Sequence, residues 1–538
     1  MGTGIAGATR ARSLEICDVS PFSKDSAERR AFALNACIED VLRAVTVRTA
    51  DRLKSEQPKH SARTLRAATR FIPLSFGFAA MLAMLDAAST ALLCLLTALP
   101  PAFRILVSMY QPAFAARRTN QGLSATADRE LPVYTVIAPL HREARVVDQL
   151  LSAIERLDYP AGKLDVILIV EANDPETHAA ITGRKHRLPI TVIPAPPVGP
   201  CTKPKALNIA LELARGVFVA VYDAEDRPDS NQLRCALQAF HSGDDDLACV
   251  QARLCVDTKL TWLARYFTAE YAGHFDVFLS KLAALGLPLP LGGSSNHFRT
   301  AVLRQVGGWD PYNVTEDADL GMRLARFGYR CAVINSTTYE EAPTSVRRWL
   351  GQRSRWFKGW MQTFLVHMRE PRQLLRELGL RGFVTFLLVV GGNAFAAMAH
   401  PIFVVGLFCR IAFGVGDPLE IATCAASVLI GYMPSIFLAW RGLSYRGVPK
   451  RLRILAWTPV HWLLLSVAAW RAAGELIATP SYWNKTEHGL DKAQSIVPAL
   501  IKLSRHIEDM ERRGELPQIW IDATCSAANQ RQLPQAFA

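Results

Sequence analysis

The sequence lacks the patterns of a zinc-binding, secreted or nucleic-acid-binding protein. Its 11 cysteines show no C-x-x-C spacing and no histidine at ligand spacing, which excludes the common zinc modules and favours buried thiols in a reducing compartment. The first apolar run begins only near Phe71, after a polar, arginine-containing segment, so no cleavable signal peptide is indicated. The formal net charge is +13, yet no basic stripe carries interleaved aromatic residues. We therefore expect this positive charge to contact a membrane surface or a phosphorylated ligand. We expect no nucleic-acid partner.

Hydrophobic residues make up 50% of the 538 residues, and they are segregated along the chain. Apolar runs gather at 71–110 and 381–478, whereas 131–360 has the composition of a soluble α/β domain. The first run is about twice the roughly 20 residues that cross a bilayer, which predicts a hairpin with a turn at Asp86. Basic residues flank this hairpin on both sides, so the positive-inside rule places both flanks in the cytoplasm.

Three further apolar spans follow the soluble domain, at 383–413, 421–440 and 454–477. An amphipathic helix with interfacial aromatic residues is predicted before them, directly after Trp356. Three single crossings would leave the C-terminal tail on the side of the membrane opposite to the soluble domain. The first span, however, contains Gly391, Gly392 and Pro401 and is long enough to fold as two crossings.

From Pro132 onward, short apolar strands alternate with helices, which predicts a mainly parallel sheet with helices on its faces. Ligands of such sheets bind beyond the carboxyl ends of the strands. Acidic residues follow two of the predicted strands, Glu171 and Asp174 after one and Asp223 to Asp226 after another. The predicted strands lie at 133–138, 165–170, 190–193 and 216–222.

Asp223 and Glu225 flank a single residue after a buried strand, so both can face one opening and share a divalent cation with a diphosphate. Mg²⁺ and Mn²⁺ prefer carboxylate and phosphate oxygens and keep positions open for substrate. The neighbouring Asp226 is an alternative ligand. An acidic run before Pro228 is also good turn and N-cap material, which is the purely structural alternative.

Lys203 and Lys205 stand at the start of a predicted helix. Lysines are unfavourable at the positive end of a helix dipole unless an anion is present. A diphosphate would supply that anion, and a pair of solvated lysines is the alternative.

Thr315, Glu316 and Asp317 are followed, some thirty residues later, by Gln352 and the pair Arg355 and Trp356. Taken alone, the first group could be an N-cap with acidic residues in the first helical turn, and the second could be interface packing. A T-E-D followed by Q-x-x-R-W at this separation, behind acidic strand ends, resembles the membrane-bound family 2 glycosyltransferases that include the cellulose, chitin and hyaluronan synthases.

This resemblance implies a role for each matching residue. Asp317, with Glu316 beside it, would be the general base that accepts the proton of an acceptor hydroxyl. Asp223 would hold the metal with Glu225, which stands where the family usually has aspartate. Arg355, planar and always charged, suits the phosphate side, and Trp356 suits the acceptor sugar. The remaining donor-site residues implied by the resemblance are Pro139, Glu143, Glu171, Asp174, Lys203, Lys205 and Gln352.

The segment around Lys485 and Thr486 resembles a nucleotide-gating segment of the synthases, which must lie in the cytoplasm. This expectation conflicts with three single crossings. We give the motif more weight, because the first apolar span could fold as two.

We therefore expect an α/β, A-type (Rossmann-like) glycosyltransferase domain on a multi-pass α-helical membrane domain, in a bacterial-type inner membrane with the catalytic domain in the cytoplasm. The expected function is inverting, Mg²⁺- or Mn²⁺-dependent polymerisation of a β-linked polysaccharide from a nucleotide sugar, with export of the chain and possible export partners. The alternatives are a non-processive enzyme that makes a lipid-linked sugar, and an inactive scaffold or export subunit. The expected regions are 1–70 (N-terminal), 71–118 (hairpin), 131–360 (catalytic), 361–478 (interfacial and transmembrane helices) and 479–538 (gating-like segment and tail).

Overall fold

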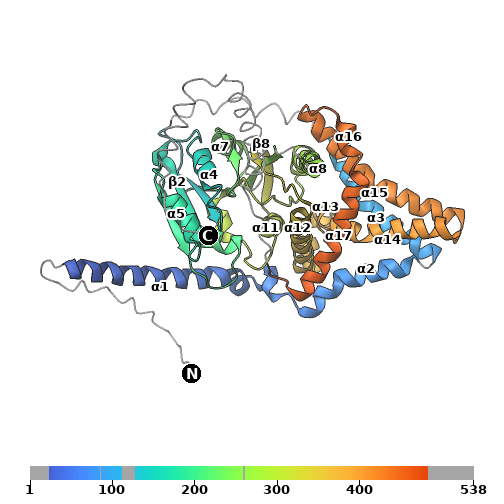
Figure 1. Ribbon diagram of the computed structural model, residues 1–538, viewed down its shortest axis with the longest axis horizontal. Helices are drawn as coiled ribbons and strands as arrows, with labels where there is room; N and C mark the ends of the chain where they lie inside the picture. Colours follow the sequence, from blue (N-terminus) through green and yellow to red (C-terminus); the bar gives the residue numbers. More distant parts are fainter. Residues whose placement is uncertain (1–23, 85, 112–127, 258–260, 483–538) are drawn as a thin grey trace, which may run out of the picture.

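The computed structural model describes residues 24–84, 86–111, 128–257 and 261–482. An α/β domain lies in the middle of the molecule, a bundle of long helices projects from one side of it, and the N-terminal helix α1 (Lys24–Glu56) extends along the other side (Figure 1). The segment after α1 is tied to the α/β domain, because Arg369 donates hydrogen bonds to the carbonyls of Pro58, Lys59 and Ser61.

The described residues of the α/β domain form an eight-stranded sheet of order β3-β2-β1-β4-β7-β6-β8-β5. The strands β1 to β4 pair in parallel, as the alternation of strands and helices predicts. Strand β7 runs antiparallel between β4 and β6, and β8 pairs in parallel with β6. The strands are β1 (Tyr134–Leu140), β2 (Leu164–Glu171), β3 (Ile190–Ala195), β4 (Phe218–Val221), β5 (Arg227–Pro228), β6 (Leu247–Val256), β7 (Asn296–Arg299) and β8 (Arg330–Glu340).

Two apolar clusters cover the two faces of this sheet. One contains side chains of α4 (Val147–Ile154), α5 (Pro175–Thr182) and α7 (Gln232–Ser242). The other contains side chains of α6 (Lys203–Leu213), α8 (Trp262–Tyr271) and α11 (Glu316–Arg326). Helices on both faces complete the three-layer α/β architecture that the sequence predicts.

A layer of helices joins the sheet to the projecting bundle. Helix α8 continues through the π-helical segment η7 (Ala272–Leu279) into α9 (Ser280–Ala284). Helix α12 (Val346–His367) carries the Q-x-x-R-W motif, and α13 (Pro371–Phe386) packs against α11, with Arg326 bonded to Glu377. The apolar side chains of α12 cluster with those of α14 (Gly392–Phe413) and α17 (Thr458–Ala478).

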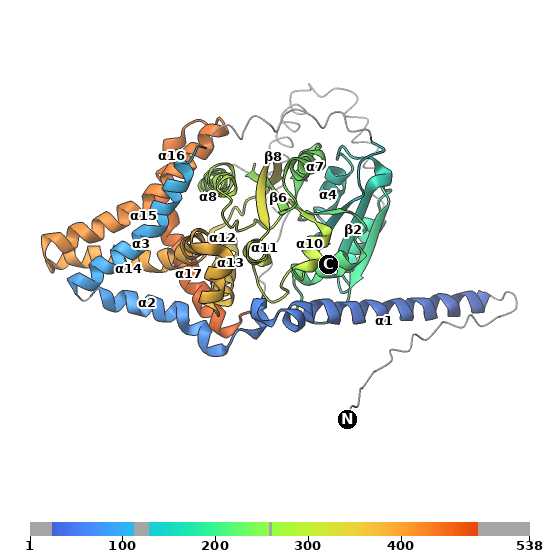
Figure 2. The same cartoon turned by 180° about the vertical axis from the view of Figure 1, so that it is seen from behind.

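The bundle consists of two hairpins that point away from the α/β domain (Figures 1 and 2). The first is formed by α2 (Ile72–Ala83) and α3 (Ala87–Met109), with Asp86 capping α3, and the second by α14 and α15 (Pro418–Tyr445). Their tips meet, because Arg410 near the end of α14 donates to the carbonyl of Met84 between α2 and α3. By length and composition, four described segments can cross a membrane: Ala87–Met109, Pro371–Phe413, Pro418–Tyr445 and Arg451–Ala478.

Helix α17 is apolar enough to cross, but both of its ends contact the α/β domain. At its start Thr458 accepts a hydrogen bond from Tyr266 of α8. Directly after its end, the carbonyls of Thr479 and Tyr482 accept hydrogen bonds from Lys358 of α12. Both ends of α17 therefore lie beside α8 and α12, and residues 479–482 lie next to Lys358. A crossing near 454–477 stays a prediction, and Arg451–Ala478 is long and apolar enough for it. The α13 part of the first long span packs on α11, and two crossings within this span also stay a prediction.

Candidate active site

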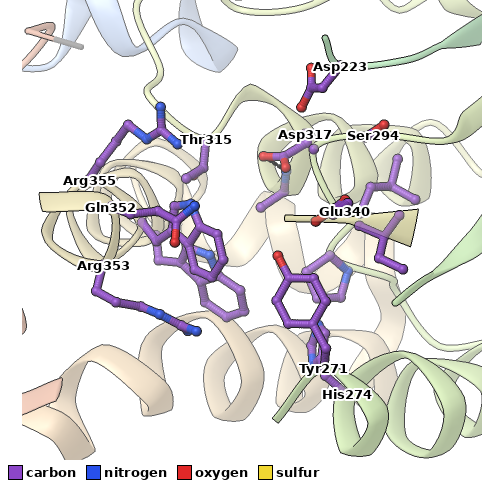
Figure 3. Close-up of a pocket in the computed structure, with 18 of the residues that line it drawn as sticks. Asp223, Tyr271, His274, Ser294, Thr315, Asp317, Glu340, Gln352, Arg353 and Arg355 are labelled. Carbon is purple, nitrogen blue, oxygen red and sulfur yellow. Dashed lines mark hydrogen bonds between the residues drawn. The ribbon is translucent and has the colours of Figure 1, made fainter. Parts of the chain in front are cut away.

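A cavity of about 380 Å³ lies between the carboxyl ends of the strands, the start of α11, helix α12 and the base of the bundle. Side chains from the strand ends, from the start of α11 and from α12 surround it (Figure 3), and residues of the bundle complete its lining. Asp223 lies at one end of the view, Asp317 in the middle, and Tyr271 and His274 at the opposite end. The cavity is therefore an elongated site with a sheet end and a membrane end.

The acidic run after β4 divides into residues that face the cavity and one that does not. Asp223 and Glu225 line the cavity. Asp226 is fully buried, accepts a hydrogen bond from the backbone N–H of Asp223 at 2.6 Å, and also accepts one from Ser294 Oγ. Burial and the neighbouring Asp223 raise the pKa of Asp226 well above its usual range. Asp226 thus shapes the turn, and Glu225 remains as the second cavity-facing carboxylate.

The described residues contain no group of three or more His, Cys, Asp or Glu side chains arranged as a metal site. Two carboxylates that face one cavity nevertheless fit a hard divalent cation whose other ligands are phosphate oxygens and water. Burial and the nearby Asp223 raise the pKa of Glu225 well above its usual range. A cation at this place would relieve that repulsion, so the donor set is compatible with Mg²⁺ or Mn²⁺ once a diphosphate is present.

Of the two lysines at the start of α6, only Lys203 lines the cavity. Its Nζ lies 2.5 Å from Asp223 Oδ1 and donates to the carbonyl of Gly293. Burial alone would lower the pKa of Lys203, but Asp223 and Glu316 outweigh this effect and raise it. Lys205 is fully buried on another face of the helix, since two residues correspond to about 200° of rotation. The structure therefore brings Lys203, and not Lys205, to the site.

The acids after β2 also separate into two roles. Glu171 lines the cavity and forms a 3.0 Å ion pair with the buried Lys205. Asp174 is not part of the cavity lining, because it caps α5 by accepting a hydrogen bond from the backbone N–H of Thr177 at 3.2 Å. Pro139 and Glu143 line the cavity as expected from the resemblance, and Glu143 is buried.

Asp317 stands at the start of α11, at the centre of the cavity. Burial raises its pKa and that of the adjacent Glu316, the latter to about 7. A methyl group on Gly293 would lie 3.3 Å from Asp317 Oδ2, 3.8 Å from Lys203 Nζ and 4.0 Å from Asp223 Oδ2. Three functional side chains therefore converge around a position without a side chain. A carboxylate whose pKa is raised towards neutrality is suited to accept a proton.

Helix α12 brings Gln352, Arg355 and Trp356 to the wall opposite the strand ends. The helix lies directly on the T-E-D turn, because a Cβ atom on Gly359 would overlap Thr315 Oγ1. Between these motif residues, Arg353 forms a bidentate pair with Glu270 of α8 at 2.7 and 2.6 Å. Its guanidinium also lies over the ring of Trp356, 4.4 Å from the ring centre. The orientation of Trp356 is thus set by a residue that the motif leaves unspecified.

Sequence reasoning missed several residues of the cavity. They are Tyr271 and His274 from the aromatic helix before the glycine loop, Glu340 at the end of β8, and Glu270 with Arg353. Glu340 faces the cavity across from Gln352 and Arg355 (Figure 3). The only signal for it was an acidic residue at the end of a predictable strand. Lys485 and Thr486 lie outside the described residues.

Comparisons with known proteins show similarity to glycosyltransferases. Residues 218–473 match the family described as glycosyl transferase family group 2. A probable glycosyltransferase of Bacillus subtilis, YdaM, is 26% identical over 304 residues, which cover 54% of this chain and 70% of that protein. The beta-monoglucosyldiacylglycerol synthase of Trichormus variabilis is 27% identical over 240 residues, covering 44% of this chain and 50% of its own length.

Among solved structures, a mannosyltransferase from Pyrobaculum calidifontis in complex with GDP-Man and Mn²⁺ superposes with a TM-score of 0.47 and 19% identity, covering 71% of this chain and 98% of that chain. The chain spans about half the length of the beta-monoglucosyldiacylglycerol synthase it resembles. The family match covers β4 to α17 and includes Asp223, Asp317 and the Q-x-x-R-W helix. The part of the chain from β4 into α17 therefore matches a family 2 glycosyltransferase domain and includes candidate membrane helices, and these similarities support a glycosyltransferase enzyme.

Proposed function

We propose that this enzyme transfers a hexose from a UDP-sugar, with inversion, to the end of a β-linked glycan, and that it repeats the transfer on the same chain. The observation that carries the proposal is the convergence of Asp317, Lys203 and Asp223 around Gly293. This group sits midway along a cavity that extends from the strand ends to the membrane helices. Such a cavity can admit donor from one end and hold acceptor at the other.

The donor diphosphate would lie against Asp223, Glu225 and Lys203. A Mg²⁺ or Mn²⁺ ion bound there would neutralise the charge that develops on the leaving diphosphate. Lys203 at the helix start and Arg355 across the cavity add cationic donors for the same oxygens. The pyrimidine end would reach the pocket formed by Pro139, Glu143 and Glu171.

Asp317 would accept the proton of the acceptor hydroxyl as that oxygen attacks the anomeric carbon. The bond between the anomeric carbon and the diphosphate breaks on the opposite face, so the configuration inverts. Trp356 would stack on the terminal acceptor sugar, and Arg353 behind it would hold the ring in place.

The proposed location is a bacterial-type inner membrane, with the α/β domain in the cytoplasm where nucleotide sugars are made. Two hairpins that cross the bilayer leave the domain and residues 479–482 on the same side. A cytoplasmic gating role for the segment around Lys485 is consistent with this arrangement. Export of the product would occur through or beside the bundle, with possible partner proteins.

A second candidate is a single transfer onto a membrane lipid. The names of the related glucosyldiacylglycerol synthases favour it. The catalytic chemistry at Asp317 and Asp223 would be the same, and only the acceptor would differ.

The test uses the purified protein in lipid nanodiscs with radiolabelled UDP-glucose, UDP-N-acetylglucosamine, UDP-glucuronate or GDP-mannose, with Mg²⁺ or Mn²⁺. A product of many sugars per chain from one UDP-sugar is expected. A product that extracts into chloroform and carries only one sugar would replace the first candidate by the second. The matched control is Asp317→Asn, which should give neither product.

A further inference from the structure

A second, smaller cavity continues from the membrane end of the active site into the bundle. Its volume is about 60 Å³, and it lies between α3, α14, α15 and α17. The two cavities share a ring of side chains with one member from each of these helices. We call this set the neck, and its members are Arg104, Asn393, Ser435 and Trp462.

Arg104 is the only charged member of the neck. Among the described residues it has no ion pair within 4.0 Å, and its buried Nε has no hydrogen-bond partner. Its guanidinium rests on the ring of Phe278, at 4.8 Å from the ring centre. Glu270 acts on it electrostatically but is already bonded to Arg353. Other arginines of this helical region are paired: Arg353 with Glu270, Arg410 with Glu420 and Arg446 with Asp276.

A cation beside membrane helices is unfavourable unless a negative charge compensates it. Arg104 is five residues before the end of α3 that faces the α/β domain, about 7 Å along the helix at 1.5 Å per residue. It can therefore reach a ligand that occupies the membrane end of the catalytic cavity. An anionic ligand group at this place would supply the missing charge.

The other neck residues favour a sugar as the carrier of that anion. Asn393 offers an amide, and Trp462, whose ring lies beside His400 at 5.5 Å between ring centres, donates its indole N–H to Ser435 Oγ at 3.1 Å and lines both cavities. Polar groups beside an aromatic ring are typical of sugar recognition.

We propose that the neck binds a carboxylate-bearing sugar of the acceptor glycan, behind the residue that Asp317 deprotonates. The inference rests on the proposed glycan acceptor and names its class: an acidic glycan that contains uronate residues. Arg104 forms a charge-assisted bidentate contact with the carboxylate, and Trp462 contacts the ring of the same sugar.

Calorimetry on the protein in phosphatidylcholine nanodiscs tests this with two β-linked disaccharides, cellobiose and cellobiouronic acid, which differ in a single carboxylate. The wild-type protein should bind cellobiouronic acid at least about tenfold more tightly, as expected for one charge-assisted hydrogen bond. Arg104→Gln should reduce this preference to less than about threefold, and Arg104→Lys should keep part of it.

Arg441→Gln is the matched control, because it removes the same charge from the surface end of α15, where Arg441 contacts Tyr445. It should leave the preference unchanged. Binding of UDP with Mn²⁺ should be the same in all variants, because donor residues lie at the sheet end. Loss of UDP binding in Arg104→Gln would show that this variant is misfolded. In that case, the disaccharide preferences of the wild-type protein and of Arg104→Lys test the inference.

Equal binding of the two disaccharides by the wild-type protein would overturn the inference, as would a preference that survives Arg104→Gln. Loss of the preference in phosphatidylglycerol nanodiscs would identify the neck as a lipid head-group site and would also overturn it. The readout is binding and not turnover. Transfer without uronate preference therefore rejects this inference alone, and uronate preference without transfer rejects the proposed function alone.

Discussion

The two ends of the catalytic cavity differ in how their charges are compensated. At the sheet end, charged side chains stand in opposed pairs, such as Lys203 with Asp223 and Lys205 with Glu171. At the membrane end, aromatic rings dominate, and Arg104 is not ion-paired within the described part of the chain. A preorganised set of charges suits a ligand that is the same in every cycle, such as a nucleotide diphosphate. Aromatic surfaces without fixed hydrogen bonds suit a ligand that must move on after each transfer.

The largest effect should come from the residue between the two ends. Asp317→Asn removes the proton acceptor and should lower transfer by at least about 100-fold, within the range attributed to general-base catalysis. Binding of UDP with Mn²⁺ should change less than about threefold, because Asp317 does not act on the diphosphate. Steady-state transfer and calorimetric UDP titration measure the two quantities. Retention of more than a tenth of the wild-type rate would mean that another group is the base.

The charged pairs of the sheet end can be tested with the same substitution at two neighbouring positions. Asp223→Asn should weaken Mn²⁺-dependent UDP binding by about tenfold or more, because a cavity-facing carboxylate is lost. Asp226→Asn should change it by less than about threefold, because the Asp226 side chain is fully buried and accepts hydrogen bonds from the backbone N–H of Asp223 and from Ser294, and does not line the cavity. Similar losses at both positions would show that Asp226, and not Asp223 alone, serves the metal.

At the membrane end, Trp356→Ala removes the proposed platform for the acceptor sugar. Stacking of a ring on an aromatic side chain contributes about 1 to 3 kcal/mol by analogy with base stacking, so polymer formation should fall about tenfold. Hydrolysis of the donor to free sugar and UDP should be nearly unchanged, because the donor pocket is intact. Chromatography of products separates the two activities. A parallel loss of hydrolysis would place Trp356 at the donor instead.

A smaller effect is expected from Glu270→Gln, which weakens the bidentate contact to Arg353 and so loosens the support of Trp356. The acceptor KM should rise several-fold with little change in kcat. Glu270→Asp, which keeps the charge, should recover part of the loss. If kcat falls and the acceptor KM stays constant, Glu270 does not act through the acceptor platform.

The last prediction is that a cysteine placed after α17 does not react with a thiol reagent in intact cells. Ser481 follows α17 and precedes the carbonyl of Tyr482, which is bonded to Lys358 of the α/β domain. Ser481→Cys, in a protein whose native cysteines have been replaced, should therefore resist a membrane-impermeant thiol reagent in intact cells and react after permeabilisation. Rapid labelling of intact cells would place residue 481 outside and remove the basis for a cytoplasmic gating segment.

The sequence predicts the sheet end well because strand periodicity also predicts where each strand ends. Asp223, Glu171 and Asp317 could be found because parallel strands deliver their final residues to one edge. Sequence spacing does not reveal which of two nearby side chains faces the cavity. Lys205 and Asp174 were therefore expected at the site, although Lys205 pairs with Glu171 inside the domain and Asp174 caps α5.

The membrane end was harder to predict. Arg353 and Glu270 are far apart in sequence, and each is a common residue type for a helix surface. Hydropathy does not separate the packing of α17 against α12 from burial in lipid, because both demand apolar side chains. The contacts of α17 with α8 and α12 join residues that are far apart in sequence, so spacing did not predict them.

The absence of a side chain at Gly359 has a mechanical consequence. The backbone of helix α12 at Gly359 lies directly against the side chain of Thr315 in the T-E-D turn. Gly359 has no side chain that could change its rotamer when one of the two elements moves. On its other side, α12 is packed along α17, which runs between the α/β domain and the hairpins. A shift of α17 that moves α12 would therefore change the distance between Arg355 and Asp317.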